Sequence, residues 1–82
     1  KLKIRVKFFA MCREIAGTDE VTLELPLSAT VDHFWNDIIN DYPELEKYKA
    51  HSRVALNMEY VSPQALLQDG DEVCIIPPVS GG

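Results

Sequence analysis

The chain has 82 residues, which is room for one domain and not for two. Apolar residues make up 46% of it and charged residues 26%, the balance of a folded domain rather than of a disordered segment. Eight Lys and Arg against 13 Asp and Glu give a formal net charge of −5. This charge disfavours nucleic acid and anionic membranes as partners, because both require a basic face, and it favours a basic protein surface.

Cysteine usage and hydropathy predict a cytosolic protein. Cys12 and Cys74 are too far apart in the sequence for a C-x-x-C motif, and two cysteines make no disulfide framework. They also supply too few ligands for a zinc site, so we expect no metal. The apolar runs are too short to span a bilayer, and the first five residues lack the apolar segment of a signal peptide.

The N-terminal part of the chain predicts a hairpin that a short helix interrupts. Residues 2–8 alternate between apolar and basic side chains, which is typical of a half-buried strand. Residues 10–16 favour a short helix that ends at Gly17. Residues 21–25 alternate again and predict a second strand, which Pro26 closes.

The clearest predicted helix begins at Thr30. The Thr30 hydroxyl is a good N-cap, and Asp32 lies where the helix dipole favours an acidic residue. Pro43 ends the helix, because the residue before a proline avoids the α conformation, and residues 43–48 begin a further turn. Apolar residues follow helical spacing between these limits: Val31, Phe34, Trp35, Ile38, Ile39 and Tyr42.

The C-terminal part of the chain predicts three strands. Residues 54–56 and 59–61 form two short strands joined by a turn, residues 69–71 form another turn, and residues 72–76 are apolar enough for a central strand. The order β-β-α-β-β-β with one dominant helix predicts an α+β fold, in which a mixed sheet packs on that helix. This is the β-grasp plan of ubiquitin-like domains.

The final six residues predict a tail that leaves the domain, so we divide the chain into a domain at 1–76 and a tail at 77–82. Two prolines begin the tail and stiffen it. Fully extended, it reaches roughly 20 Å at about 3.3–3.6 Å per residue. Gly81 and Gly82 have no side chains, which suits the passage of a terminal carboxylate through a narrow tunnel. A diglycine end also occurs by chance, so the tail alone does not decide the function.

Four segments carry a family resemblance in the same order along the chain: Phe8-Phe9-Ala10 with Arg13-Glu14 and Gly17, Ala55-Leu56-Asn57 with Glu59-Tyr60, Asp69-Gly70-Asp71-Glu72-Val73, and Ile76-Pro77-Pro78-Val79-Ser80-Gly81-Gly82. With them the sequence resembles the small, sulfur-carrier subunits of molybdopterin synthase over essentially the whole chain. The last segment is the most specific part of the match.

The resemblance implies that the working group is the Gly82 carboxylate. A partner adenylyltransferase and sulfurtransferase would use MgATP to form an acyl-adenylate there, and a persulfide sulfur would displace AMP to leave a thiocarboxylate. The large subunit would transfer this sulfur to precursor Z. Catalytic side chains would belong to the partners, this chain would bind no cofactor stably, and two small subunits would flank a dimer of large ones. The tail residues entering the large subunit would be Pro77, Pro78, Val79, Ser80 and Gly81.

A docking surface for the large subunit is expected on the exposed face of the sheet. We predict Phe9 and Ile75 as its apolar contact patch. Four acidic residues offer a second contact, with a basic rim on the partner: Glu59, Asp69, Asp71 and Glu72. For the last three, exposure in a solvated turn is an equally good explanation.

Three other functions stay open at this point. A thiamin-pathway sulfur carrier shares the fold and the activation, a ubiquitin-like modifier would form isopeptides with lysines, and a plain interaction module would have an incidental diglycine. An enzyme acting on its own would need Cys12 or Cys74 as its nucleophile, and neither has strongly basic neighbours. His33 and His51 are expected to have no catalytic role.

Overall fold

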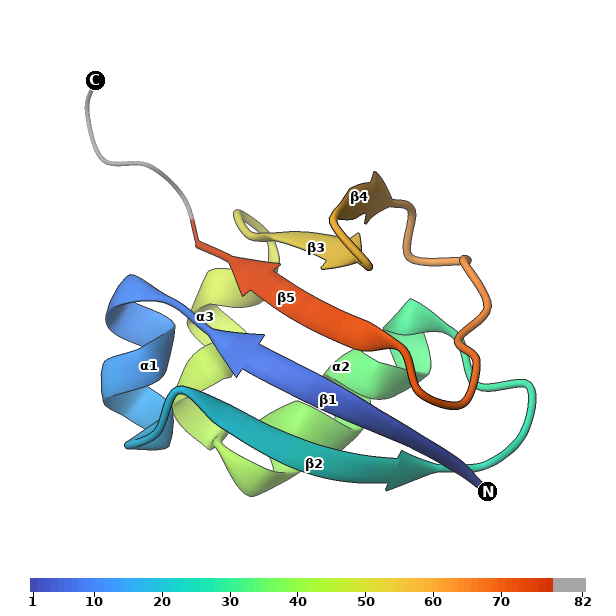
Figure 1. Cartoon of the computed structure of the whole chain (residues 1–82). Coiled ribbons are helices and arrows are strands. Elements are labelled where there is room, and N and C mark those ends of the chain that lie inside the picture. The colour runs from blue at the N-terminus through green and yellow to red at the C-terminus, as the bar shows by residue number, and fades with distance from the viewer. Residues whose placement is uncertain (78–82) are drawn as a thin grey trace.

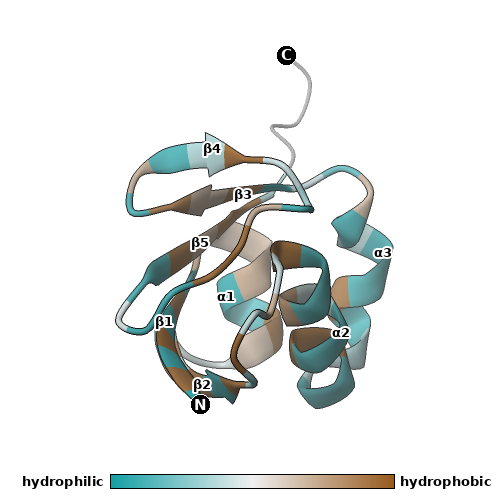
Figure 2. Ribbon diagram, turned by 90° about the vertical axis from the view of Figure 1, so that its right-hand side faces the viewer, coloured by the Kyte–Doolittle hydropathy of each residue, from teal (hydrophilic) through white to brown (hydrophobic). Residues whose placement is uncertain are grey.

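The computed structural model describes residues 1–77. They form two layers, a five-stranded sheet and a set of helices that cover one of its faces (Figure 1, Figure 2). The elements in chain order are β1 (Leu2–Phe8), α1 (Ala10–Ala16), β2 (Glu20–Leu25), α2 (Val31–Asp41), η1 (Pro43–Leu45), α3 (Glu46–Lys49), β3 (Arg53–Leu56), β4 (Glu59–Val61) and β5 (Glu72–Ile76).

The sheet has the strand order β2-β1-β5-β3-β4. Its two central strands, β1 and β5, run parallel, and the other neighbouring strands are antiparallel. Because β5 lies in the middle, both of its edges are hydrogen-bonded and its side chains are covered by neighbours. The predicted β-grasp arrangement, with a mixed sheet packed on one main helix, is confirmed.

The interrupted hairpin has a simple local cause. β1 and β2 pair antiparallel from Leu2 opposite Leu25 to Lys7 opposite Glu20, and α1 fills the connection between them. Gly17 ends α1 in the left-handed conformation, with φ of 75°, and its N–H donates to the Arg13 carbonyl. A side chain at this backbone angle is disfavoured, so glycine is the suitable residue.

α2 is fixed at its start by a cap and at its end by a proline. The Thr30 hydroxyl accepts a hydrogen bond from the His33 N–H at 3.2 Å, and Pro43 begins the 3-10 turn that follows. Phe34 and Trp35 are both buried although they are consecutive, with 0% and 4% of their surfaces exposed. The helix therefore buries a broad stripe, because the sheet covers one flank of it and the following turns cover the other.

The sheet has two unlike faces, which we call the helix face and the open face. Alternate residues of each strand point to opposite faces, and the burial pattern of β1 shows which face is covered. The hydropathy colouring shows the same separation, with apolar segments between the layers and polar ones on the outer helix surfaces (Figure 2). Side chains with 0% exposure are Ile4, Val6, Cys12, Phe34, Ile38, Leu45, Val73 and Ile75. Burying each of the larger ones stabilises the fold by roughly 1.5–3 kcal/mol.

Candidate functional site

The tail is predicted to begin where β5 ends. Ile76 is the last strand residue and Pro77 the last described one. The predicted tail residues from Pro78 to Gly81 and the predicted reacting residue Gly82 lie outside the described residues, so the boundary at residue 76 stays a prediction. β5 ends beside the end of β1, in the middle of one edge of the domain (Figure 1). The surface around this point is the part of the candidate site that the structure describes.

The prediction that Ile75 lies on an exposed face is wrong. Ile75 is 0% exposed and belongs to the hydrophobic core. It pairs with Phe8 on one side and with Val54 on the other, all three on the helix face. Ile76 is the neighbour that points to the open face, and it is half-buried there. The sequence does not show which face of the sheet Ile75 points to, because residues 73–76 form an unbroken apolar run without alternation.

Three apolar side chains that reach solvent come from the strand ends and strands near the end of β5: Phe9, Tyr60 and Ile76, which we call the tail-root patch. Phe9 is 44% exposed, as expected, and its extended backbone turns it away from the buried Phe8. Tyr60 is 57% exposed and lies opposite Ala55 on the open face. Tyr60 and Ile76 were not predicted from the sequence, because only the register of β3, β4 and β5 assigns them to this face.

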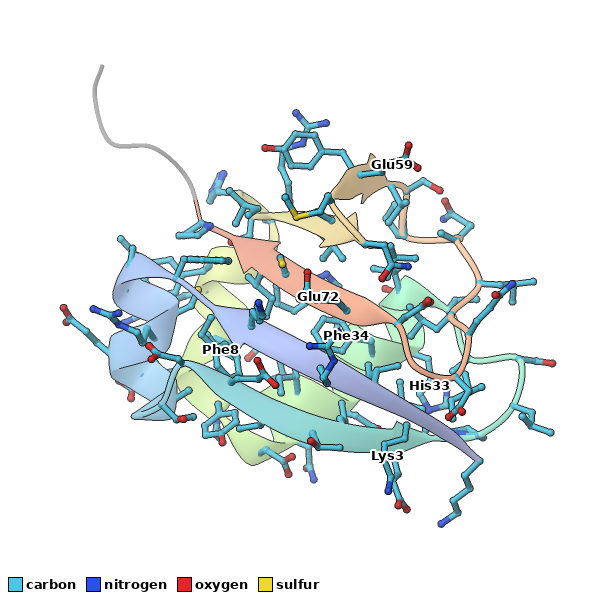
Figure 3. All side chains as sticks on the ribbon, viewed as in Figure 1. Lys3, Phe8, His33, Phe34, Glu59 and Glu72 are labelled. Atoms are coloured by element: carbon cyan, nitrogen blue, oxygen red, sulfur yellow. The ribbon has the colours of Figure 1, made fainter. Side chains whose placement is uncertain are left out.

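The charged residues of the open face are mixed and partly paired. The Lys7 ammonium lies 3.0 Å from the Glu72 carboxylate, and the Arg5 guanidinium lies 3.7 Å from it. The hydrogen bond to Glu72 raises the pKa of Lys7 above its usual range. Figure 3 labels Glu72 and Lys3 on this face of the sheet. Basic strand residues here are Lys3, Arg5, Lys7 and Arg53, and acidic ones are Glu20, Glu24 and Glu72. The acidic excess of the chain therefore lies elsewhere on its surface.

Three of the acidic residues predicted as docking contacts are used within the fold. Asp71 accepts hydrogen bonds from the Gln68 N–H at 2.8 Å and from the Asn57 amide at 3.0 Å. Asp69 accepts one from the Lys3 N–H at 2.8 Å. Glu72 pairs with two cations of β1, as described above. These contacts indicate that Asp69, Asp71 and Glu72 stabilise the fold. Glu59 differs from them in being exposed.

Neither cysteine has the surroundings of a nucleophile. Cys12 and Cys74 are both free and buried, and burial raises the pKa of each thiol above its usual range. The reactive thiolate is thereby disfavoured. His33 is exposed, with its imidazole 4.0 Å from the Asp37 carboxylate, and His51 is exposed in a turn. The part of the chain that the structure describes thus offers no thiol activated for catalysis.

A metal site and a membrane-spanning helix are both absent from residues 1–77. This range holds no group of three His, Cys, Asp or Glu side chains placed to bind a metal ion. Its longest helix, α2 with 11 residues, is shorter than a bilayer crossing requires, and none of its helices could serve as a membrane span.

The fold defines a class of protein. The model of the ThiS family matches residues 6–82. Among solved structures, a putative molybdopterin converting factor subunit 1 from Pyrococcus furiosus superimposes with a TM-score of 0.88 at 36% identity, covering 96% of this chain and 100% of that one. The small archaeal modifier protein 1 of Haloferax volcanii gives a TM-score of 0.87 at 27% identity, with the same coverage of both chains.

The curated relatives show which members of the ThiS family this chain resembles. The molybdopterin synthase sulfur carrier subunit of Chlamydomonas reinhardtii is 46% identical over 83 residues, covering 99% of this chain and 100% of the relative. The corresponding subunit of Arabidopsis thaliana is 37% identical over 81 residues, covering 99% of this chain and 84% of the relative. The chain belongs to the ThiS family and, within it, to the sulfur carrier subunits of molybdopterin synthase.

Proposed function

We propose that this chain carries sulfur as a thiocarboxylate on Gly82 and delivers it for the synthesis of molybdopterin. The similarity over the full length of the Chlamydomonas relative carries this proposal. A free carboxylate is a poor electrophile, so a partner adenylyltransferase would first use MgATP to form an acyl-adenylate. The terminal sulfur of a persulfide on that partner would then displace AMP to form an acyl disulfide. A second thiol of the partner would cleave its S–S bond, which leaves the thiocarboxylate on Gly82 and a disulfide on the partner, and the large subunit would transfer the sulfur to precursor Z.

The buried thiols support a carrier that lacks catalytic chemistry of its own. With both cysteines held in the less reactive thiol form, neither is suited to attack an adenylate or a persulfide. The activating groups would therefore belong to the partners, and this chain would bind no cofactor stably. Free buried thiols also agree with a reducing compartment, and we propose the cytosol.

The tail-root patch is proposed as the docking surface for the large subunit. It replaces the predicted pair of Phe9 and Ile75 by Phe9, Tyr60 and Ile76. Phe9 follows β1, which pairs with β5 up to Ile75, and Tyr60 lies on β4, two strands from β5. Docking there would direct residues 77–81 into the partner. A distant protein of the same fold, subunit 1 of the Helicobacter pylori molybdopterin-converting factor, was solved in complex with subunit 2 (TM-score 0.70, 22% identity). We expect a heterotetramer of two small and two large subunits, which light scattering of the purified complex tests.

The decisive experiment is the intact mass of the chain after incubation with the activating enzyme, MgATP and a sulfur source. The expected change is the replacement of one oxygen by one sulfur, located at Gly82 by fragmentation. A variant that lacks Gly82 should fold normally, as circular dichroism checks, but accept no sulfur and support no synthesis of molybdopterin. Gly82→Ala should impair loading, because its Cβ widens the tail. Sulfur delivery by the folded deletion variant would refute the proposal.

A second function has one observation in its favour. The similarity to the small archaeal modifier protein 1 favours a modifier that joins its terminal carboxylate to lysines of other proteins. Conjugates that survive a denaturing gel and disappear in the Gly82 deletion variant would establish it. A thiamin-pathway carrier would instead pass its sulfur to a different acceptor, which an assay with precursor Z and the large subunit distinguishes.

A further inference from the structure

Arg53 differs in its surroundings from Arg5 and Lys7, the two cations of the open face that pair with Glu72. As the first residue of β3, it lies opposite Ile76 in the sheet register. Its guanidinium carbon lies 4.3 Å from the centre of the Tyr60 ring. Within residues 1–77 no carboxylate lies within ion-pair distance of Arg53, whereas Lys7 holds Glu72 at 3.0 Å. Arg53 therefore places, between two members of the tail-root patch, a charge that no carboxylate of the described residues pairs with.

Stacking on Tyr60 orients the Arg53 side chain. A guanidinium over an aromatic face gains a cation–π attraction and loses part of its conformational freedom. Its N–H donors then lie in a fixed plane, which suits a carboxylate that accepts two parallel hydrogen bonds. Arginine and tyrosine are also the residue types that most often dominate the energetics of protein interfaces.

A protein that docks on the tail-root patch also changes the solvation of the Arg53 guanidinium. A protein that covers Tyr60 and Ile76 also removes water from Arg53, which lies between them. An unpaired charge withdrawn from water is strongly unfavourable, and a paired one with good hydrogen bonds is tolerated. The covering surface must therefore offer an acceptor, and a carboxylate is the group that matches a guanidinium best.

We propose that the Arg53–Tyr60 pair is an anchor that binds a carboxylate on the large subunit and so helps to select that partner. This inference rests on the proposed function, because it takes the tail-root patch as the docking surface. It differs from the expectation drawn from the net charge of −5, which favoured a basic partner surface. At the tail-root patch this chain supplies the positive charge, on Arg53, and the large subunit supplies the carboxylate.

The test is the affinity of the purified large subunit for variants of this chain, measured by calorimetry at about 50 and about 300 mM NaCl. Arg53→Gln should raise Kd by about tenfold or more at both salt concentrations, mainly through faster dissociation, because a covered charge pair is little screened. Arg53→Lys should lie between wild type and Arg53→Gln, since an ammonium cannot form the planar pair.

Two further variants separate the anchor from general effects of charge and fold. Lys47 also lies over a tyrosine ring, that of Tyr48, at 5.5 Å, but on α3 in the helix layer (Figure 1). Lys47→Gln makes the same change of charge and should leave Kd within about twofold of wild type. The double variant Arg53→Gln with Tyr60→Leu should bind little worse than Arg53→Gln alone, because the two side chains act as one unit.

The outcomes are distinguishable. If wild type binds and Arg53→Gln binds equally well, or if its defect disappears at high salt, Arg53 is uncovered or lies at the rim and the anchor is refuted while the carrier function stands. If the wild-type chain binds no large subunit although it is folded, both proposals fail.

Discussion

Ile75 and Ile76 are chemically identical neighbours in one strand, and the structure places them in opposite environments. Ile75 is fully buried on the helix face, between Phe8 and Val54. Ile76 lies half-buried on the open face, where it borders the tail and Arg53. The comparison of the two faces shows that the same side chain stabilises the fold at one position and is available for a partner at the next.

The helix face and the open face also differ in their charged side chains. On the helix face of the strands, the side chains that pack into the core are apolar. On the open face, basic and acidic side chains alternate across the strands, and Glu72 links two cations of β1. Apolar residues gather there only near the end of β5. The open face is therefore suited to contact with a second protein, and the helix face to folding.

The largest effect should be seen on the two thiols, one in the core cluster and one on the open face. Because Cys12 and Cys74 are buried and burial raises the pKa of each, little thiolate forms in the folded chain. At mildly alkaline pH, alkylation of either should be about a hundredfold or more slower than in denaturant. Mass spectrometry of iodoacetamide adducts over time measures this. Rapid modification of the folded chain at either residue would show that the thiols are accessible.

The next largest effect should be a difference in the free energy of unfolding between alanine variants of Ile75 and Ile76. Ile75→Ala should lower the free energy of unfolding by about 2–5 kcal/mol, because it leaves a cavity in the core. Ile76→Ala, the matched control, should cost less than about 1 kcal/mol, since solvent already reaches this side chain. Urea denaturation of both variants gives the comparison. Equal losses would mean that the two faces are equally packed at this end of β5.

The same pair should give the opposite order in binding. Ile76→Ala should raise the Kd for the large subunit by about tenfold, close to 1.4 kcal/mol, through loss of a central apolar contact. Ile75→Ala should bind like wild type once the unfolded fraction is taken into account. Calorimetry at a temperature where both variants are folded measures this. Normal binding by Ile76→Ala would remove this residue from the docking surface.

A smaller effect should come from the acidic turn. Asp71→Ala removes the acceptor of the Gln68 and Asn57 hydrogen bonds and should lower the free energy of unfolding by about 1–2 kcal/mol. Affinity for the large subunit should stay the same. Glu59→Gln, at an exposed position of β4, is the control and should change stability by less than about 0.5 kcal/mol. A binding defect in Asp71→Ala at full folding would restore the predicted docking role of this residue.

The smallest effect concerns the turn between β3 and β4. Asn57 and Met58 have φ of 49° and 77°, the angles of a hairpin turn that favours Asn-Gly. Met58 is 83% exposed, so its side chain gains little from packing. Met58→Gly should raise the free energy of unfolding by about 0.5–1 kcal/mol, because it relieves the left-handed strain of an L-residue. Thermal denaturation tests it, and a loss of stability would show that the Met58 side chain makes a stabilising contact.

Much of the fold could be predicted because its signals are local. The alternation of residues 2–8, the cap at Thr30, the stop at Pro43 and the glycine at position 17 each act over a few residues, and each is found as expected. The candidate tail could be recognised just as easily, because proline restricts the backbone and glycine has no side chain. Its described part is Pro77, and the roles of the residues beyond it stay predictions.

The proposed docking surface could be predicted from the sequence only in part. Phe9 was predicted as an apolar residue of the exposed sheet face, and it is 44% exposed. Tyr60 and Ile76 come from strands that are distant in the sequence and adjacent in the sheet. Their common face follows from the pairing of β3 with both β4 and β5, and no local pattern records that register.

The sequence by itself determined the elements, the β-grasp fold and the family, since these depend on spacing, capping and a specific ending. The tertiary structure alone decided which of two isoleucines is core, which acidic residues hold a turn, and that Arg53 stacks on Tyr60 without a carboxylate partner in the described part of the chain. The physical reason is that a strand presents alternate residues to opposite faces. Within an unbroken apolar run, therefore, only the neighbouring strands and the covering helix decide which residue is buried.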